Sequence, residues 1–334
     1  MTRSLTRLLT RSLGAAAALL ATAAVIAHVV ALAGCRANPP APSSRSSSPS
    51  AARLPTRIVT LAPSLTETVY ALGLGDRVVG VSDYSAWPPE AARKPRLGGL
   101  FNPDLERTVG LKPDLALLVP SQRDLGVKLA RLGIASLEVP SESLADVERS
   151  FVVLGDRCGA AAAGRQLAAR FHAALAPRPA AVVRTAAGAR PLAVLLSVGR
   201  DPGRIANVLA AAPGTFLDEL LTRLGGRNVF ADAPVRYPQV GLEELVARAP
   251  DVVLELNNDP LPETTVRRLL ADWRSLPQVP AVAHGRIQVI AGDYVLIPGP
   301  RLPLLYDQMA AVLGRAAATM SGTMAATMAT KGGA

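Results

Sequence analysis

Short apolar runs rich in β-branched residues alternate with longer amphipathic stretches in the first half of the chain. The runs occupy residues 57–61, 78–81, 115–119 and 136–139. After the first run, Ser64-Leu65-Thr66-Glu67 has the pattern of a helix capping box, and Asn102-Pro103 places a capping residue before a first-turn proline. This alternation of strands and helices predicts an α/β lobe with a mostly parallel sheet over residues 55–142.

The same alternation returns in the second half. We expect strands at residues 192–197, 252–256 and 287–290, and helices at residues 215–224, 242–249, 264–273 and 302–313. These elements predict a second α/β lobe over residues 178–315, followed by a frayed, low-complexity tail at 316–334. Between the lobes, residues 144–175 contain no proline and many Ala, Arg and Leu residues, which predicts one continuous helix in the segment 143–177.

The N-terminal part of the sequence predicts a secretion signal followed by a flexible tether. Arginines precede an apolar run at residues 13–33, which ends in Leu32-Ala33-Gly34-Cys35. Small residues followed by cysteine are typical of a bacterial lipoprotein signal, so we expect residues 1–34 to be cleaved and Cys35 to carry a lipid. An uncleaved membrane anchor is the alternative. Residues 35–54, rich in Pro, Ser and Ala, predict a flexible tether. Both interpretations place the body outside the cytoplasm, held on a membrane in the periplasm or at the cell surface.

The composition limits the number of domains and the classes of binding partner. The chain has 334 residues, 49% of them hydrophobic, which suffices for about two domains. Its formal net charge is +10, and nucleic-acid binding is one interpretation of such a charge. The arginines are scattered and alternate with acidic residues, and no basic run is interleaved with aromatic residues. We therefore expect a solvated surface and no nucleic-acid partner.

The reactive side chains argue against catalysis. Beyond the apolar N-terminal run, the only histidines are His172 and His284, which lack the spacing of metal ligands. Ser64 follows a proline and caps a helix, with no histidine placed as its base. We expect no enzyme, metal or cofactor, and a secreted metallohydrolase is the less favoured alternative. With Cys35 lipidated, Cys158 stands alone, which predicts a small buried side chain and no disulfide.

Each lobe contains one short pattern at the same spacing. Leu105-Glu106 and Pro113-Asp114 precede a strand in the first lobe, and Leu242-Glu243 and Pro250-Asp251 precede a strand in the second. A local interpretation is that glutamate suits the first turn of a helix. A functional interpretation is that the two glutamates mark equivalent points on the lobes, which a partner with two symmetric basic pockets grips at once.

Longer stretches share their order and spacing with one known family. They span residues 57–64 with Glu67, 81–91, 105–115, 224–230 with 237–240, and 292–294 with 298–301. The segment from Val81 to Ala91 is similar to that family's first ligand loop, and Pro298-Gly299-Pro300-Arg301 to its last. The chain resembles, over residues 57–314, the substrate-binding proteins of ABC importers for cobalamin, haem and ferric siderophores, and most closely the cobalamin-binding members.

The resemblance implies two Rossmann-like α/β lobes joined by one long rigid helix, with a largely preformed ligand cleft between the lobes. It implies a monomeric, lipid-anchored protein that captures cobalamin or a related corrinoid, the cobalt arriving with the ligand. The partner it implies is an ABC permease dimer with its ATPase subunits. Glu106 and Glu243 match the two carboxylates that pair with arginines of the permease in this family.

A large planar ligand needs aromatic walls and a few polar groups at its rim. By position, Tyr84, Tyr237 and Asp293 match ligand contacts of the family. We expect walls from Tyr84, Trp87, Phe101, Tyr237 and Tyr294, and rim contacts from Asp293 and Arg301.

Residues that differ from the family's pattern leave more than one class of ligand to consider. Leu100-Phe101 and Val119 stand where the cobalamin-binding members have tryptophans, and Leu224 stands where they have a disulfide-bonded cysteine. A ferric siderophore or haem is the alternative ligand, and an anionic chelate calls for basic groups in the cleft. The candidates for that role are Arg96, Arg123, Arg200 and Arg204. A free-standing scavenger without a permease is a further alternative, which the paired glutamates disfavour.

Overall fold

The computed structural model describes residues 53–178, 190–201 and 203–331, with side chains up to residue 320. The chain divides into two units, and every described helix and strand belongs to the second, Leu54–Ala334. The predicted signal peptide, Cys35 and most of the predicted tether lie outside the described residues. None of the described helices has both the length and the apolar character needed to cross a membrane.

A four-stranded parallel sheet forms the N-terminal lobe, as predicted. Its strands, in the order β2-β1-β3-β4, are β1 (Ile58–Thr60), β2 (Val78–Val81), β3 (Leu115–Leu118) and β4 (Ser136–Glu138). The connections contain α2 (Pro63–Ala71), η2 (Gly75–Arg77), α3 (Pro89–Ala92), α4 (Leu105–Gly110), η3 (Pro120–Gln122) and α5 (Arg123–Arg131). Every residue of β3 is buried, because a central parallel strand is covered on both faces.

The predicted capping box at the start of α2 is wrong. The helix begins at Pro63, and its N-cap residue is Ala62, which makes no side-chain capping bond. Proline is well suited to the first helical position, because its fixed φ matches the helix and its missing N–H needs no partner there. Ser64 therefore lies inside the helix, and Glu67 is free to bond elsewhere.

A six-stranded mixed sheet forms the C-terminal lobe. Its path is β10-β9-β5-β6-β8, with β7 paired to β5. The strands are β5 (Ala193–Gly199), β6 (Val208–Ala210), β7 (Arg227–Asn228), β8 (Gln239–Val240), β9 (Val252–Asn257) and β10 (Ile287–Ala291). Strand β6 pairs in antiparallel fashion with both β5 and β8, and the other pairs of this sheet are parallel. The helices are α8 (Phe216–Arg223), α9 (Leu242–Arg248), α10 (Glu263–Asp272), η5 (Trp273–Ser275), α11 (Pro280–Ala283) and α12 (Leu302–Lys331).

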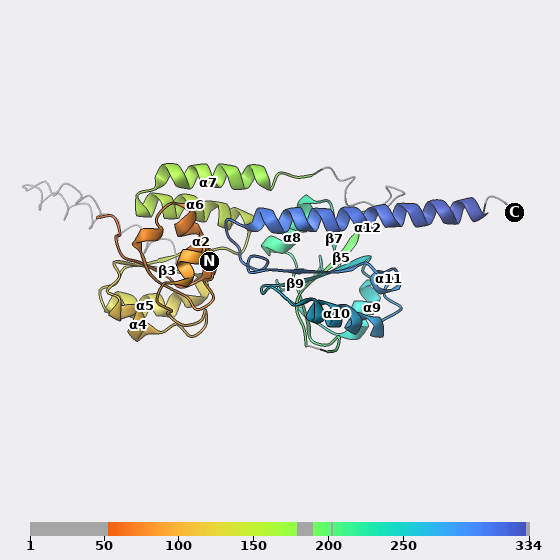
Figure 1. Cartoon of the computed structure of the whole chain (residues 1–334), viewed down its shortest axis with the longest axis horizontal. Coiled ribbons are helices and arrows are strands. Elements are labelled where there is room, and N and C mark those ends of the chain that lie inside the picture. Colours follow the sequence, from red (N-terminus) through yellow and green to blue (C-terminus); the bar gives the residue numbers. More distant parts are fainter. Residues whose placement is uncertain (1–52, 179–189, 202, 332–334) are drawn as a thin grey trace, which may run out of the picture. The chain divides into compact units, whose positions relative to one another are not determined.

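The prediction of one continuous helix between the lobes is wrong. The segment forms a hairpin of two helices, α6 (Leu144–Cys158) and α7 (Ala161–Ala174), which lie side by side in Figure 1. The chain turns at Gly159, whose φ of 77° is left-handed. Glycine adopts that conformation without steric cost and is the common C-cap of a helix, so the turn is encoded locally.

Two glycines that lower the predicted helix propensity instead allow the hairpin to pack closely. A Cβ on Gly164 would lie 2.5 Å from the carbonyl oxygen of Phe151, and one on Gly155 would lie 3.0 Å from the Cα of Gly164. The absence of side chains at this crossing lets the two backbones approach. The rings of Phe151 and Phe171 then meet edge to face, with centroids 5.2 Å apart.

Both open ends of the hairpin are bonded to the C-terminal lobe. The carboxylate of Glu219 accepts the N–H of Leu144 at 3.1 Å, and Arg223 donates to the carbonyl of Leu175 at 2.8 Å. The other end of the hairpin contacts the N-terminal lobe, where Arg77 donates to the carbonyl of Cys158 at 2.8 Å. The lobes are therefore braced by two helices where the prediction had one. Cys158 itself is buried, as predicted.

Three buried apolar clusters form the core of the described part. Trp273 belongs to one confined to the C-terminal lobe, and Leu129 to one confined to the N-terminal lobe. The largest joins residues of both lobes and of the hairpin: Ile58, Phe151, Phe171, Val194 and Tyr306. Each buried side chain of this size contributes about 1.5–3 kcal/mol, so moving the lobes apart would expose apolar surface at a high cost.

The last helix is longer than predicted. The sequence pattern places its end near residue 313, but α12 continues to Lys331, and Ala316 and Ala317 are buried. Figure 1 shows α12 as one uninterrupted helix. The alanine- and methionine-rich composition that suggests a frayed tail is also that of a good helix former, which explains the extension.

Candidate functional site

A cavity of 660 Å³ lies between loops of the two lobes. This volume is in the usual range of small-molecule sites. Its walls are Ala62, Pro63, Ser64, Tyr84, Leu100, Phe101, Asn102, Val119, Pro120, Ser121, Ser141, Glu142, Phe216, Tyr237, Asn258, Leu296, Ile297 and Pro298.

Topology explains why these loops meet. The lining segments follow the carboxyl ends of strands in both sheets: Ser64 follows β1, Tyr84 follows β2, Pro120 follows β3, and Asn258 follows β9. In open α/β sheets, ligands bind outside the carboxyl ends of the strands. The cavity is therefore where this fold places a binding site.

Three of the predicted wall residues line the cavity. Tyr84 and Phe101 come from the N-terminal lobe and Tyr237 from the C-terminal lobe. Their exposed fractions are 67%, 85% and 38%. Exposure of such large rings is unusual away from interaction sites, and here it leaves three aromatic faces available to one ligand. Leu100 and Val119, at positions where the family resemblance implies tryptophans, also line it.

Hydrogen bonds fix the conformation of the loop that carries Tyr84. The Arg96 guanidinium donates to the carbonyls of Ser82 at 3.0 Å and Ser85 at 2.9 Å. The hydroxyls of Ser82 and Ser85 are 2.7 Å apart, and a further hydroxyl bond of 2.8 Å joins Ser85 to Thr66. Arg96 therefore fixes the loop, and it does not line the cavity.

The other four predicted ligand residues lie in a separate cluster. Arg301 donates two hydrogen bonds to the carboxylate of Glu67, at 3.0 and 2.7 Å, and one of 2.7 Å to that of Asp293. Its guanidinium lies over the rings of Trp87 and Tyr294, at 5.0 and 5.6 Å from their centroids. None of Trp87, Asp293, Tyr294 and Arg301 lines the 660 Å³ cavity; Trp87 and Arg301 line a smaller one of 360 Å³ beside Glu67.

The pair of Glu67 and Arg301 joins the two lobes. Glu67 lies on α2, and Arg301 immediately precedes α12. The side chain of Glu67 is 3% exposed and that of Arg301 is 14% exposed. Burial raises the pKa of Glu67, although the bonds from Arg301 work against that rise. Burial also opposes the charge on Arg301, but its bonds to Glu67 and Asp293 raise its pKa overall. This is a buried ion pair with both partners bonded.

The remaining arginines named for an anionic ligand are also engaged elsewhere. Arg123 pairs with Glu138 on the surface through bonds of 2.9 and 2.6 Å, and Arg204 pairs with Asp201. Arg200 is buried and bonds to Glu255 at 2.6 Å.

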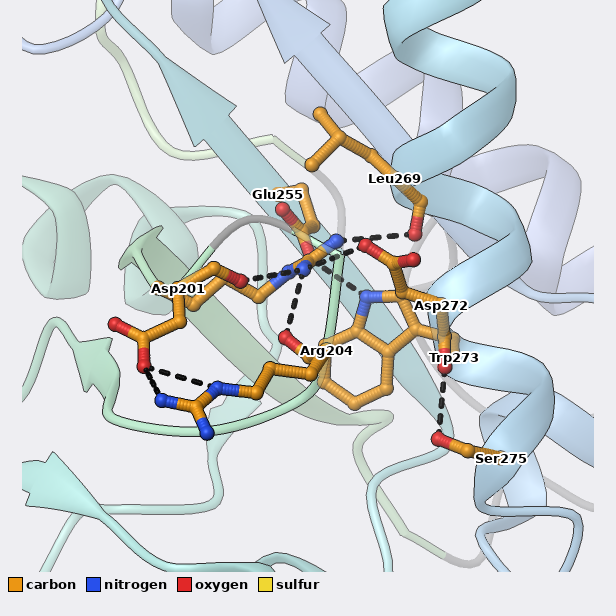
Figure 2. A network of polar contacts seen from close by, with 8 residues as sticks. Asp201, Arg204, Glu255, Leu269, Asp272, Trp273 and Ser275 are labelled. Carbon is orange, nitrogen blue, oxygen red and sulfur yellow. Dashed lines mark hydrogen bonds and ion pairs between the residues drawn. The ribbon is translucent and has the colours of Figure 1, made fainter.

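Arg200 belongs to a polar network whose members Glu255, Leu269, Asp272 and Trp273 are labelled in Figure 2. Its guanidinium also bonds to the carboxylate of Asp272 at 2.9 Å, while the indole N–H of Trp273 donates to Glu255. The carbonyl of Leu269 accepts a further bond of 3.1 Å. A guanidinium that is satisfied in this way inside the C-terminal lobe stabilises the lobe and is not available to a ligand.

One charged side chain, Glu142, lines the cavity among the residues that the structure describes. Burial, with the nearby Glu142 carboxylate, raises the pKa of Tyr237 to about 12. Apart from the tyrosines, the other polar wall residues are also neutral: Ser64, Asn102, Ser121, Ser141 and Asn258. Glu142 and these five neutral residues were not predicted as walls, although the rule on carboxyl ends, applied to each predicted strand, points to Ser141, Glu142 and Asn258.

The repeated pattern of the sequence has the same structural basis in both lobes. Asp114 accepts the N–H of Arg57 at the start of β1, and Asp251 accepts the N–H of Ala193 at the start of β5. In each lobe the aspartate before a strand therefore anchors the neighbouring strand. Bonds to the charged form lower the pKa of both carboxyls, in spite of their burial.

The two matched glutamates are exposed at the starts of short helices. Glu106 is in the first turn of α4, which begins at Leu105 after the cap Asp104, and not at Asn102-Pro103 as predicted. Glu243 is in the first turn of α9. Within the described part of the chain, neither carboxylate has a hydrogen-bond or ion-pair partner. Both are available to an external cation.

No group of side chains suited to hold a metal ion is found in the described ranges. The described wall residues include no histidine or cysteine, and the Nδ1 atom of His172 lies 3.2 Å from the carboxylate of Glu148. The site can thus enclose a ligand with aromatic, aliphatic and neutral polar groups, and it presents no nucleophile paired with a base.

Comparisons with known proteins agree with this geometry. Residues 58–294 match the family model of periplasmic binding proteins. The vitamin B12-binding protein of Vibrio cholerae serotype O1 is 29% identical over 253 residues, which cover 73% of this chain and 84% of that protein. The vitamin B12-binding protein of Photorhabdus laumondii is 30% identical over 268 residues, covering 76% and 86%.

Solved structures are similar over the same region. The periplasmic vitamin B12-binding protein of Vibrio cholerae superposes with a TM-score of 0.64 at 27% identity and covers 78% of this chain and 98% of its own. A periplasmic haem-binding protein from Roseiflexus sp. RS-1 gives 0.63 at 25% identity, with coverage of 78% and 98%. The predicted α/β fold class and the family resemblance are confirmed.

Proposed function

This chain belongs to the periplasmic binding protein family, and from that premise we propose that it captures cobalamin or a related corrinoid and delivers it to an ABC permease. It acts as a monomer outside the cytoplasm, held on the membrane by a lipid on Cys35. It makes and breaks no covalent bond of its ligand, and the cobalt enters with the ligand.

The lining of the cavity is the observation that supports this proposal. Aromatic rings from both lobes face a space bounded by aliphatic side chains, and apart from Glu142 and the tyrosines the polar positions are amides and hydroxyls: Ser64, Asn102, Ser121, Ser141 and Asn258. A corrinoid combines a large flat ring with a rim of amide groups, which both donate and accept hydrogen bonds. Neutral polar side chains satisfy such a rim without the cost of burying an unpaired charge.

The engaged arginines favour a corrinoid over a ferric siderophore. An anionic chelate that loses its hydration needs cations in the walls of its site. Arg96 bonds to backbone carbonyls, and Arg200 is enclosed with two carboxylates. Arg123 and Arg204 pair with acidic side chains on the surface. Releasing Arg96 or Arg200 would leave carbonyls or buried carboxylates without a partner, and Arg123 and Arg204 do not line the cavity.

Haem is the second candidate, supported by the likeness to the haem-binding protein of Roseiflexus sp. RS-1. Haem iron takes histidine, cysteine, methionine or tyrosine as an axial ligand, and only Tyr84 and Tyr237 offer such a group among the wall residues. The described wall offers no histidine, cysteine or methionine to the iron, and this ranks haem below a corrinoid.

Docking to the permease uses Glu106 and Glu243. Each carboxylate is exposed and unpartnered in the described structure, and the helices that carry them occupy equivalent places in the two lobes. Arginines of a permease dimer would meet both in charge-assisted pairs, which fix the register of the complex. A free-standing scavenger would have no use for this matched pair.

Calorimetric titration of the full chain in detergent tests the ligand. We expect saturable binding of cyanocobalamin and weaker binding of haemin and of a panel of ferric siderophores. Binding of haemin or of a siderophore in preference to cyanocobalamin would overturn the corrinoid proposal. The visible spectrum of the complex identifies which ligand is bound, because the three chromophores absorb differently.

A further inference from the structure

Glu142 is the one charged residue in the described lining of the cavity. Its backbone is fixed where the N-terminal lobe meets α6, because its carbonyl accepts the N–H of Phe216 at 2.8 Å. The next residue, Ser143, caps α6 in a reciprocal capping box with Asp146. The carboxylate of Glu142 therefore projects from a rigid point of the wall, and its side chain is 45% exposed.

The nearest cation neutralises Glu142 only weakly. Nη1 of Arg236 is 3.6 Å from a carboxylate oxygen of Glu142, beyond the length of a good hydrogen bond. The side chain of Arg236 is 56% exposed and does not line the cavity. Exposed pairs of this kind contribute little and rearrange easily.

Other cations close to the site are balanced by their own partners. Arg301 pairs with Glu67 and Asp293, and Arg96 is held by carbonyls. The described wall thus presents a negative charge from Glu142 and no positive charge of its own.

We propose that Glu142 sets the charge of the ligand that this cleft accepts, favouring a neutral or positively charged corrinoid and repelling anionic chelates. This inference rests on the proposed function. The carboxylate accepts hydrogen bonds from donors on the ligand rim and attracts a positive charge at the metal centre, whereas the carboxylates of haem or of an anionic siderophore meet it with like charge.

Aquacobalamin and cyanocobalamin form a matched pair of probes. At mildly acidic pH the aqua form carries a positive charge and the cyano form is neutral, while the corrin ring and its amides are the same. A third probe, haemin, carries two carboxylates. The experiment measures the dissociation constants of all three for the full chain, for Glu142→Gln and for Glu244→Gln.

Glu244→Gln is the matched control. Glu244 is 47% exposed and pairs with Arg248 at 3.1 Å, so it resembles Glu142 in exposure and in having an arginine partner. It lies on α9 and not in the cavity wall. Its substitution removes one surface charge without changing the wall.

We expect Glu142→Gln to weaken aquacobalamin relative to cyanocobalamin by about fivefold, the effect of one unit charge about 4 Å away in water-like surroundings. It should strengthen haemin relative to cyanocobalamin by a similar factor, because the negative charge that repels the two haemin carboxylates is removed. Glu244→Gln should leave both ratios unchanged. If Glu142→Gln leaves both ratios at their wild-type values while cyanocobalamin binds, the inference fails and the proposed function stands.

The salt dependence of the wild-type chain gives a test that needs no variant. Added salt should bring the affinities for aquacobalamin and cyanocobalamin together, because screening weakens the attraction of the partly exposed Glu142. A ratio that does not respond to salt contradicts the inference. If haemin binds and neither corrinoid does, or if none of the three probes binds, both the inference and the proposed function are overturned.

Discussion

Removing the guanidinium of Arg301 should strongly destabilise the protein, because Glu67 would be left buried without a cation. In Arg301→Met the apolar stem remains and the charge is lost. Asp293 is 39% exposed and can return to water, but Glu67 is 3% exposed and cannot. Breaking a buried ion pair by removing one partner typically costs 3–5 kcal/mol.

Protonation of Glu67 sets an upper bound on this loss of stability. The buried carboxyl can avoid its unpaired charge by taking up a proton. Holding a glutamate protonated at pH 7 costs roughly 3–4 kcal/mol, because glutamate ordinarily titrates near pH 4.3 and each pH unit corresponds to about 1.4 kcal/mol. We therefore expect Arg301→Met to lower the free energy of unfolding by roughly 3 kcal/mol at pH 7.

The pH dependence identifies the mechanism. Burial already raises the pKa of Glu67 in the wild-type chain, and losing Arg301 raises it further. A carboxyl whose folded-state pKa is above its unfolded value destabilises the fold at higher pH, and the loss shrinks as pH falls through the folded pKa toward the unfolded one. The defect of Arg301→Met should therefore be largest near pH 7 and small near pH 5.

Urea unfolding, followed by the fluorescence of Trp87 and Trp273, measures the loss. Arg123→Met is the control, since Arg123 also makes two bonds to a glutamate but is exposed on the surface. Glu67→Gln combined with Arg301→Met should recover much of the stability, because no buried charge remains. A loss for Arg301→Met that equals that of Arg123→Met, or that persists undiminished at pH 5, would refute the reasoning.

Three further predictions follow from the site and the hairpin. Tyr84→Ala and Phe101→Ala should each weaken cyanocobalamin about tenfold, or roughly 1.4 kcal/mol, in calorimetry, whereas Leu132→Ala, an exposed apolar residue outside the cavity wall, should have no effect. Reversing both docking charges, Glu106→Arg with Glu243→Arg, should abolish uptake of labelled cyanocobalamin by cells and leave its affinity for the purified protein intact; unchanged uptake would contradict the docking role. Gly164→Ala places a Cβ 2.5 Å from the Phe151 oxygen and should lower stability by roughly 1–3 kcal/mol, while Gly110→Ala, with nothing within 4 Å, should be neutral or slightly stabilising; equal melting temperatures for the two variants would contradict the close crossing of α6 and α7.

The alternation of strands and helices was predictable because it rests on local signals. The buried strands β3, β5 and β9 are short apolar runs, and each lies within two residues of its expected bounds. The hairpin was not predicted, although Gly159 was visible, because a glycine in an alanine-rich stretch weakens a helix but does not always end it. Packing of Gly164 on the backbone of Phe151 decides between them, and such a contact between helices has no periodic signature.

Some features of the site were likewise predictable from the sequence, and others were not. Tyr84, Phe101 and Tyr237 were predicted as walls and line the cavity, since exposed aromatic residues in loops after strands have few other roles. Arg301 was predicted to meet the ligand, and the chemistry behind that prediction was sound, because a guanidinium in such a loop needs a carboxylate or a similar acceptor. Its partner is Glu67, 234 positions earlier in the chain. Sequence identified the need for a partner, and only the fold could supply it.

The contacts that enclose Arg301 also connect the two lobes. The shared apolar cluster, the two-helix brace and the Glu67–Arg301 pair all connect the lobes, and each must be broken for a wide opening. Domain closure needs a hinge of few contacts, and these connections are many and buried. The cleft is therefore built before the ligand arrives, and adaptation falls to the exposed rings of Tyr84 and Phe101. A preformed cleft loses little conformational entropy on binding, which suits a member of the periplasmic binding protein family.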